Sequence, residues 1–308
     1  MNATINLEKK HFPVLLNELV NIISPLYGGT FIDCTFGEGG YSKKILENST
    51  NKIIALDRDY EVKNFADKLK IEFNHRFDFY NLKFSDLNKF KTKKPKCIIF
   101  DLGYSFNQIK NLEKGLSFQS KSKLNMQMGL NEFSCHEVIH NMKKENLNKI
   151  FKFFGDEKYS KKIAKNIVEK RKTNTIDTED LTKIIDGVKK FNNSKINNST
   201  KVFQALRIFV NKEISELING LINAFNLIPV GGVITVVTFH SLEDKIVKFF
   251  FKNYSENKNL SRYIPNKKEN NICFKLKVKK PITPGLEELK INPPSRSSKL
   301  RFAIKIKK

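Results

Sequence analysis

The sequence predicts an α/β protein in which a Rossmann-like sheet carries an inserted all-helical domain. In the first hundred residues, short β-branched runs alternate with helical patterns, which is typical of βαβ units and a parallel sheet. From about residue 108 to 195 no run has a convincing strand pattern, and apolar residues recur at helical spacing. A further buried strand at 231–239 then returns the chain to the sheet.

Local patterns give the individual elements. Strands are predicted at 30–36, 52–57, 76–82 and 97–103, and helices at 41–47, 62–73, 144–154, 159–172, 178–190 and 242–251. One long helix, roughly 201–227, is expected to lead back from the insertion. The alternating segments 272–282 and 299–308 predict a terminal antiparallel pair. Polar stretches at 189–201 and 252–271 predict exposed connections.

Composition limits the class of protein. A chain of 308 residues with 40% hydrophobic residues and 26 Phe can build a sizeable core. It has no apolar run long enough to cross a bilayer, and its N-terminus lacks the pattern of a signal peptide. The four Cys lie far apart without paired spacing. We therefore expect a cytoplasmic protein without a membrane partner.

The net charge of +24 favours a polyanionic partner such as nucleic acid. An A+T-rich coding sequence would also give many Lys, Asn and Ile, so the charge permits such a partner without proving it. Only seven of the 56 basic residues are Arg. In a chain that otherwise uses Lys, an Arg indicates a place that needs a planar fork of donors.

A Gly-rich loop follows the first predicted strand. The segment GEGGYS, Gly37–Ser42, lets the backbone turn sharply and come close to a ligand. Asp57 lies twenty residues after Gly37, at the end of the next strand, where a carboxylate can accept ribose hydroxyls. A Gly-rich turn without a ligand is the alternative interpretation.

Charge around this loop distinguishes between nucleoside ligands. Asp33 precedes the loop and Glu38 lies inside it. Carboxylates repel a pyrophosphate but suit a ligand with an ammonium and a sulfonium group, so the loop predicts S-adenosylmethionine. Asp101 ends the fourth strand, and we expect Asp33, Asp57 and Asp101 to meet at one rim of the sheet. Phe84, after the third strand, could cover the adenine or be an ordinary core residue.

These motifs identify a family resemblance along nearly the whole chain. The matching segments include HFPVLLNE, FIDCTFGEGGYS, ALDRD, FDLGYSFNQ, KGLSF, LNMQM, FGDEKYSKKIAKNIVEKR, VFQALRIFVNKEI, VTFHSLEDKIVK and NPPSRSSKLR. The chain resembles the ribosomal RNA small subunit methyltransferase H family, which methylates the N4 amine of a cytosine in the decoding region of 16S rRNA.

The resemblance implies a methyltransferase domain of residues 1–108 plus 206–308, interrupted by a helical domain at 109–205 that helps to bind substrate. The implied partner is 16S rRNA or the assembled small ribosomal subunit, and a homodimer is left open. Together with Asp33 and Gly37 from the loop argument, the predicted cofactor contacts are Gly39, Gly40, Tyr41, Asp57, Phe84, Asp101 and Gln108.

This chain departs from the family pattern at several positions. Tyr41 stands where the family usually has His, and DLGVSSPQ appears as DLGYSFNQ. LDMRM appears as LNMQM, so Asn125 and Gln127 replace a charged Asp/Arg pair, and HPATR appears as NNSTK. The cofactor side is better kept than the substrate side, so the reaction type is more secure than the target.

Transfer to an exocyclic cytosine amine needs in-line placement and acceptors for its N–H groups. We expect Asp101, or the carbonyl just after it, to accept from that amine, and Tyr104 to stack on a flipped cytosine or simply to pack. Methylation at cytosine C5 would instead need a Cys nucleophile. Cys34 and Cys97 lie within apolar strands and are interpreted as structural thiols.

RNA contacts are predicted from a polar helix face and two loops. Gln204, Arg207 and Asn211 recur at i, i+3 and i+7, opposite an apolar stripe, and a solvated polar face is the alternative. Arg296 in SRSSKLR is a further predicted RNA contact. His240 in TFHSLED is either near the substrate or a helix cap.

Two other functions are weighed. His136, Glu137 and His140 form a literal HExxH, the pattern of a zinc metallopeptidase, but no HxxGxxH follows it, and two ordinary helix His are the alternative. The substrate-side departures also allow a non-catalytic RNA-binding protein on a methyltransferase scaffold. Failure to bind S-adenosylmethionine would favour that second case.

Overall fold

The computed structural model describes residues 13–24, 28–91, 93–104, 108, 111–118, 120, 123–189, 197–256 and 272–308. The chain divides into two compact units, one of Met1–Gly103 with Leu217–Lys308 and one of Tyr104–Glu216. Most of the predicted connection at 189–201 and of the predicted loop at 252–271 lies outside the described residues.

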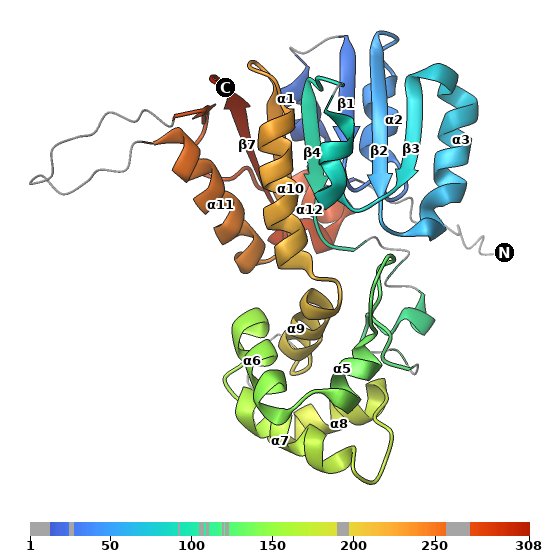
Figure 1. The fold of residues 1–308 in the computed structure, drawn as a ribbon, viewed down its shortest axis with the longest axis vertical. Helices are drawn as coiled ribbons and strands as arrows, with labels where there is room; N and C mark the ends of the chain where they lie inside the picture. Colours follow the sequence, from blue (N-terminus) through green and yellow to red (C-terminus); the bar gives the residue numbers. More distant parts are fainter. Residues whose placement is uncertain are drawn as a thin grey trace, which may run out of the picture. The chain divides into compact units, whose positions relative to one another are not determined.

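Seven strands form one sheet in the first unit, in the order β3-β2-β1-β4-β5-β7-β6 (Figure 1). Every strand expected from the sequence is present, and β7 pairs antiparallel with both β5 and β6, which confirms the predicted terminal pair. The other pairings are parallel. The strands are β1 Gly29–Asp33, β2 Asn51–Asp57, β3 Phe77–Asn81, β4 Cys97–Asp101, β5 Val233–Thr238, β6 Phe274–Lys275 and β7 Lys299–Lys305.

The strand order reverses between β1 and β4. The chain winds from β1 outward through β2 to β3, and then starts again on the other side of β1 with β4. In open α/β sheets, ligands bind at this switch point, outside the carboxyl ends of the strands. The topology therefore places the candidate site at the ends of β1, β2 and β4.

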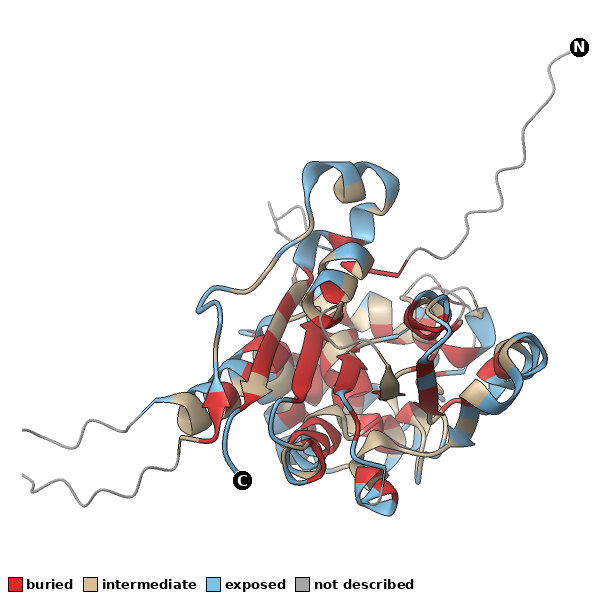
Figure 2. Ribbon diagram, turned by 90° about the horizontal axis from the view of Figure 1, so that it is seen from above, coloured by how far each residue is buried: buried red, intermediate tan, exposed pale blue. Residues whose placement is uncertain are grey.

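Helices cover both faces of the sheet. Alternate strand residues face opposite sides, so Phe31 and Ile99 pack with α1, α2 and α3, whereas Ile32 and Phe100 pack with α10 and α11. Figure 2 shows the resulting burial of the central strands. The helices are α1 Leu16–Ile23, α2 Gly40–Leu46, α3 Lys63–Phe73, α10 Glu213–Leu227, α11 Ser241–Ser255 and α12 Leu286–Ile291.

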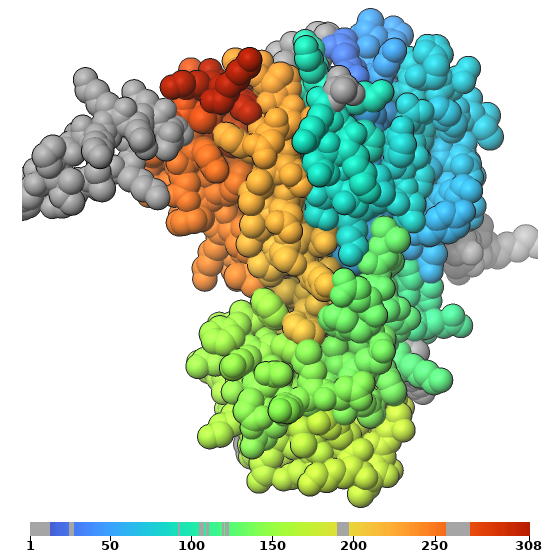
Figure 3. Space-filling view, viewed as in Figure 1, coloured from blue at the N-terminus to red at the C-terminus, as the bar shows by residue number. Residues whose placement is uncertain are grey.

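Close packing joins α10 to the 3₁₀ turn η3, Phe84–Phe90 (Figure 3). A Cβ on Gly220 would lie 2.6 Å from the Phe84 ring, and Asn223 donates to the Ser85 carbonyl at 2.6 Å. The predicted loop starting at residue 252 is wrong at its beginning, because α11 continues to Ser255. In the described part of the chain, no helix has the length and hydrophobicity that crossing a bilayer requires.

The described part of the second unit is helical, as predicted. Its helices pack around a core that includes Phe151, Ile163, Ile185 and Leu206. They are α5 Cys135–Asn141, α6 Lys144–Gly155, α7 Ser160–Lys170, α8 Thr178–Val188 and α9 Thr200–Val210. Side-chain caps fix two of the starts, with Ser134 accepting from the backbone at the start of α5 and Asp177 at the start of α8.

The prediction of one long helix at 201–227 is wrong. Helix α9 ends at Val210 and α10 begins at Glu213, with Lys212 at a φ of 52° between them. The fully buried Asn211 explains the break. Its amide nitrogen donates to the Met126 carbonyl at 2.8 Å, and its Oδ1 accepts from the Met128 amide at 2.9 Å. Bonding to a distant loop outweighs the local helical pattern.

Replacing Asn211 should therefore destabilise the protein. In Asn211→Ala the buried Met126 carbonyl loses its partner, and we expect the free energy of unfolding to fall by about 2 kcal/mol. Urea denaturation followed by circular dichroism measures this fall. Gln204→Ala, in the same helix but with a half-buried side chain, is the control and should change stability by less than about 0.5 kcal/mol. Equal midpoints for the two variants would contradict the structural role of Asn211.

Candidate active site

Three carboxylates end the strands at the switch point. Asp33, Asp57 and Asp101 are the last residues of β1, β2 and β4. Asp33 pairs in register with Ala55 and Ile99, so Asp57 and Asp101 extend two residues further along their strands. The predicted acidic rim is therefore present, but its members lie at two depths.

Asp33 is the deeper member and supports the Gly-rich loop. Its side chain is fully buried, its Oδ2 accepts from the Ser42 hydroxyl at 2.7 Å, and its Oδ1 accepts from the Thr35 amide at 3.3 Å. Burial raises the pKa of Asp33 to about 6. The expectation that Asp33 contacts a cofactor directly is corrected, because its carboxylate is buried beneath the loop and bonded to it.

The glycines of the loop have different physical roles. Gly37 has a φ of 55°, and a Cβ there would meet no atom within 4 Å among the described residues, so open space lies beside it. A Cβ on Gly39 would lie 2.7 Å from the Phe36 ring, and one on Gly40 would overlap Pro13. Gly39 and Gly40 therefore allow close packing within the protein, Gly37 leaves open space beside the loop, and the cofactor contacts of Gly39 and Gly40 stay predictions.

Asp57 fixes the same loop from the neighbouring strand. Its Oδ2 accepts from the Gly37 amide and its Oδ1 from the Asp59 amide, both at 2.8 Å. Burial raises the pKa of Asp57 to about 6, although the two amide bonds act in the opposite direction. Each oxygen has a further lone pair, so the ionised carboxylate can also accept the hydroxyls of a ribose.

Asp101 has an unsatisfied oxygen. Its amide donates to the Thr35 hydroxyl at 2.7 Å, but its Oδ1 is buried and has no hydrogen-bond partner in the part of the chain that the structure describes. Burial and the nearby Asp33 raise the pKa of Asp101 well above its usual range. Because this oxygen lies at the switch point of the sheet, it is available to accept a hydrogen bond from a ligand there.

Tyr41 lies close to this carboxylate. The ring is buried, the hydroxyl donates to the Val14 carbonyl, and the hydroxyl is near enough to Asp101 for the two groups to interact electrostatically. Burial and the charge of Asp101 raise the pKa of Tyr41 well above its usual range. Tyr41 thus links the start of the described chain to the rim. Thr35 and Ser42, which sequence analysis missed, were visible only as hydroxyls on either side of the Gly residues.

Phe84 packs into the core of the first unit. Its ring meets the Phe100 ring edge-on, with centroids 5.5 Å apart and planes at 88°. Gly220 leaves space for it on α10. This packing favours the core interpretation, and contact with an adenine stays a prediction.

Tyr104 and Gln108, which were predicted as a catalytic residue and a cofactor contact, lie in the second unit. Gln108 is buried, with 8% of its surface exposed. Tyr104 is 43% exposed, and the guanidinium carbon of Arg207 lies 4.7 Å from the centroid of its ring. The partner of Tyr104 in this structure is therefore a cation on one face of its ring.

The predicted RNA contacts differ in burial. Arg207 is 9% exposed and Asn211 is fully buried, and both are hydrogen-bonded within their own unit, which favours structural roles, so their contact with RNA stays a prediction. Half-buried Gln204 and exposed Arg296 remain predicted contacts. His240 is the N-cap of α11 in a reciprocal box with Glu243, which favours the capping interpretation.

The HExxH motif does not form a zinc site here. His140 accepts from the Ile176 amide at 3.1 Å through Nε2, and its Nδ1 lies 2.8 Å from the His136 carbonyl. Glu137 instead caps α5 together with Ser134. Among the described residues, no third His, Cys, Asp or Glu lies close enough to complete a metal site with them.

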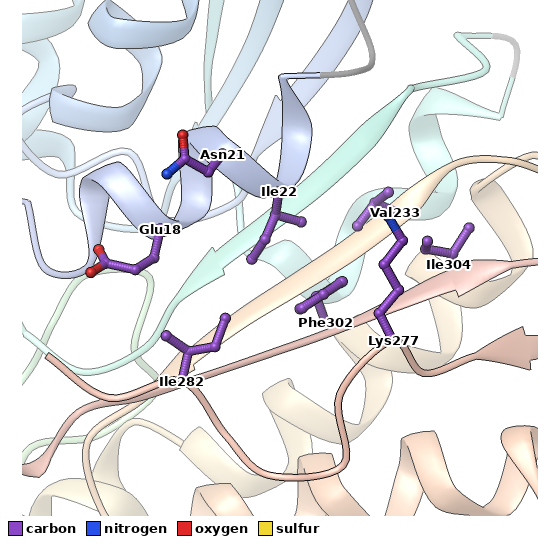
Figure 4. A pocket seen from close by; sticks show the side chains of 8 residues that line it. All are labelled: Glu18, Asn21, Ile22, Val233, Lys277, Ile282, Phe302 and Ile304. Atoms are coloured by element: carbon purple, nitrogen blue, oxygen red, sulfur yellow. The ribbon is translucent and has the colours of Figure 1, made fainter.

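A separate pocket of about 350 Å³ lies beside α1, β5 and β7 (Figure 4). Ile22, Val233, Phe302 and Ile304 give it apolar walls, and Lys277 extends along one side. None of the predicted site residues lines it. It is therefore distinct from the acidic rim.

A parallel sheet with a switch point, a Gly-rich turn after β1 and acids after β2 and β4 defines the class of Rossmann-like, S-adenosylmethionine-dependent methyltransferases. Comparison with known proteins agrees, since residues 8–306 match the model of the MraW methylase family. The chain belongs to this family. The predicted enzyme class and cofactor are thereby confirmed.

Curated relatives match almost end to end. Ribosomal RNA small subunit methyltransferase H of Rickettsia canadensis (strain McKiel) is 40% identical over 303 residues, which cover 96% of this chain and 98% of the relative. The protein of the same name from Rickettsia prowazekii (strain Madrid E) is 39% identical over 301 residues, with the same coverage.

The pKa of Asp57 gives a pH dependence for cofactor binding. Ribose hydroxyls bond more strongly to the ionised carboxylate, so binding should lower the pKa of about 6 and release a proton. Affinity for S-adenosylmethionine should then rise about tenfold between pH 5 and pH 7 and level off above. Calorimetric titration across this range measures it. Asp57→Asn, which cannot ionise, should bind more weakly and with a flatter profile, and a wild-type affinity that falls with pH would contradict the model.

Proposed function

We propose that this protein transfers a methyl group from S-adenosylmethionine to the N4 amine of a cytosine in the decoding region of 16S rRNA. The name that the two Rickettsia relatives share supports ribosomal RNA of the small subunit as the substrate. The net charge of +24 suits a polyanion. The observation that carries the proposal is the buried Oδ1 of Asp101 at the switch point, an acceptor that finds no donor among the described residues.

The residues of the first unit fit the cofactor. Gly37 offers space that a Cβ would restrict, and Asp57 offers lone pairs for the ribose. The desolvated Asp101 would gain from a ligand that carries positive charge. A pyrophosphate would meet the carboxylates of Asp57 and Asp101 and lose affinity. Bound S-adenosylmethionine supplies the methyl group, which leaves as the carbon–sulfur bond breaks and its electron pair stays on sulfur.

Asp101 has the properties of the acceptor for the amine. The amine lone pair is delocalised into the cytosine ring, so the N–H groups need a hydrogen-bond acceptor while the nitrogen forms its bond to the methyl carbon. Asp101, or the Leu102 carbonyl that follows it, takes this role. The proton displaced from nitrogen passes to the Asp101 carboxylate or to water. A carboxylate whose pKa is raised by burial is a better base than an exposed one.

The cysteines favour the amine over ring carbon C5. The thiols of Cys34 and Cys97 are buried within strands, and burial raises the pKa of Cys97 to about 12 and that of Cys34 well above its usual range. A covalent attack on the ring needs a thiolate. Neither thiol is suited to provide one.

The helical unit is proposed as the domain that recognises substrate, whether free 16S rRNA or the assembled subunit. It contains Tyr104, which has an exposed ring surface for stacking, and the half-buried Gln204. Exposed Arg296 of the first unit would add a contact. A protein that binds RNA without catalysis is the alternative, and the residues suited to hold the cofactor, Gly37, Asp57 and Asp101, favour the enzyme instead.

Replacing Asp101 should abolish the modification. We expect 16S rRNA from cells that have only Asp101→Asn to lack N4-methylcytosine by mass spectrometry, and kcat to fall by about 10²–10⁴-fold. Asp78→Asn, an exposed carboxylate in β3, is the matched control and should act as the wild type. Wild-type cells without N4-methylcytosine in 16S rRNA would refute the proposed target. A wild-type protein that does not bind S-adenosylmethionine would favour the non-catalytic alternative.

A further inference from the structure

Arg207 lies beneath the ring of Tyr104 in the second unit. Its guanidinium carbon is 4.7 Å from the ring centroid, which is the geometry of a cation–π contact. Arg207 itself is 9% exposed, whereas Tyr104 is 43% exposed. One side of the ring is thus supported from within the protein, and a large part of its surface is accessible. An exposed aromatic face of this kind can stack on a nucleobase.

Glu213 fixes the guanidinium in that position. Its Oε1 accepts from Arg207 Nε at 2.7 Å and its Oε2 accepts from Nη2 at 2.9 Å, a two-pronged pair with both side chains nearly buried. Two parallel bonds define the plane of the guanidinium as well as its place. The ring that stacks on this plane is therefore held by it.

The break between α9 and α10 makes the pair possible. In a continuous helix, residues six apart lie about 9 Å apart along the axis and about 240° around it, so Arg207 and Glu213 would face away from each other. Asn211 stabilises the break through its bonds to Met126 and Met128. The break between α9 and α10 therefore lets Arg207 and Glu213 form the ion pair that supports the Tyr104 ring.

The charge of Arg207 is already neutralised. A phosphate contact needs an exposed cation, and this guanidinium is desolvated and paired with a carboxylate. Most basic residues of this chain are Lys, and only the planar fork of Arg can bond bidentately and stack at the same time. Its environment is that of a support for a ring.

We propose that Arg207, held by Glu213, is a positioning residue that fixes the Tyr104 ring as the platform on which the target cytosine stacks. The proposal rests on the proposed function. The aromatic platform is a feature of this chain and not of the family motif, because Tyr104 stands where DLGVSSPQ has Val. Tyr104 would contact the base, and Arg207 would act only through the ring.

The test measures the affinity of the full-length protein for 16S rRNA at several salt concentrations. Arg207→Lys keeps the charge but loses the fork, and Tyr104→Ala loses the ring, so both should weaken binding by about tenfold. Tyr104→Phe keeps the ring and should weaken binding less than Tyr104→Ala does. The double variant Arg207→Lys/Tyr104→Ala should bind RNA no more weakly than Tyr104→Ala alone, because Arg207 acts only through the Tyr104 ring.

Two measurements distinguish this proposal from a direct contact between Arg207 and a phosphate. They are the salt dependence of RNA affinity and the effect of replacing Glu213. With a platform, the slope of log affinity against log salt stays at the wild-type value in Arg207→Ala, whereas loss of a phosphate contact would lower it by about 0.7–0.9. Glu213→Gln should weaken binding if Glu213 holds the platform. It should strengthen binding if Glu213 merely competes with phosphate for Arg207, and that result would overturn the proposal.

Two controls complete the design. Unchanged affinity for S-adenosylmethionine and a cooperative urea transition that begins above zero denaturant show that each variant is folded. Tyr104→Ala, at a half-exposed position, keeps the test available if Arg207→Lys is unstable. RNA affinity does not require methyl transfer. Absence of N4-methylcytosine would therefore refute the proposed function, whereas wild-type affinity of Arg207→Lys and Tyr104→Ala would refute the platform alone.

Discussion

Desolvated carboxylates at the switch point are the constraint on which the rest of the first unit depends. Removing a carboxylate from water is costly unless donors or positive charge compensate for it. Asp33 and Asp57 are compensated by hydroxyl and amide donors from the loop that they stabilise. Asp101 keeps one oxygen without a partner among the described residues. The site is thus built to be completed by a donor-bearing, positively charged ligand, which matches a methyl donor with a sulfonium group.

The sequence predicts this part of the fold well because the signals are local. Runs such as KIIALD and CIIFDLG can be buried on both faces only as central parallel strands, and the acid after each run is then carried to the same rim. The sequence does not show how deep in the sheet each of the three carboxylates lies. The register of Asp33 against Ala55 and Ile99 depends on strand pairing, so its supporting role became visible only in three dimensions.

Helical periodicity was less reliable where a tertiary bond intervenes. The pattern from 201 to 227 is apolar at helical spacing throughout, yet Asn211 ends α9 because a buried loop needs its amide. Helical periodicity also placed Arg207 on the polar face of the helix, but it did not show which side chains Arg207 contacts. Glu213 lies six residues further along the chain, and no sequence pattern linked it to Arg207. His240 was resolved more easily, since the Glu three residues later is the pattern of a capping box.

The use of Arg across the chain bears on how RNA is recognised. The prediction that Arg marks a planar fork holds for Arg207 on Glu213 and for Arg301 on Asp244, each of which donates through Nε and Nη2. Arg76 instead donates to three carbonyls through Nη1 alone. In each case the guanidinium bonds to groups of the protein itself. Most of the positive charge is Lys, a compact and mobile charge that attracts phosphates without reading a base. Under the proposed function, selection of one nucleotide would then depend on uncharged groups, and an aromatic ring held by a neutralised Arg is such a group.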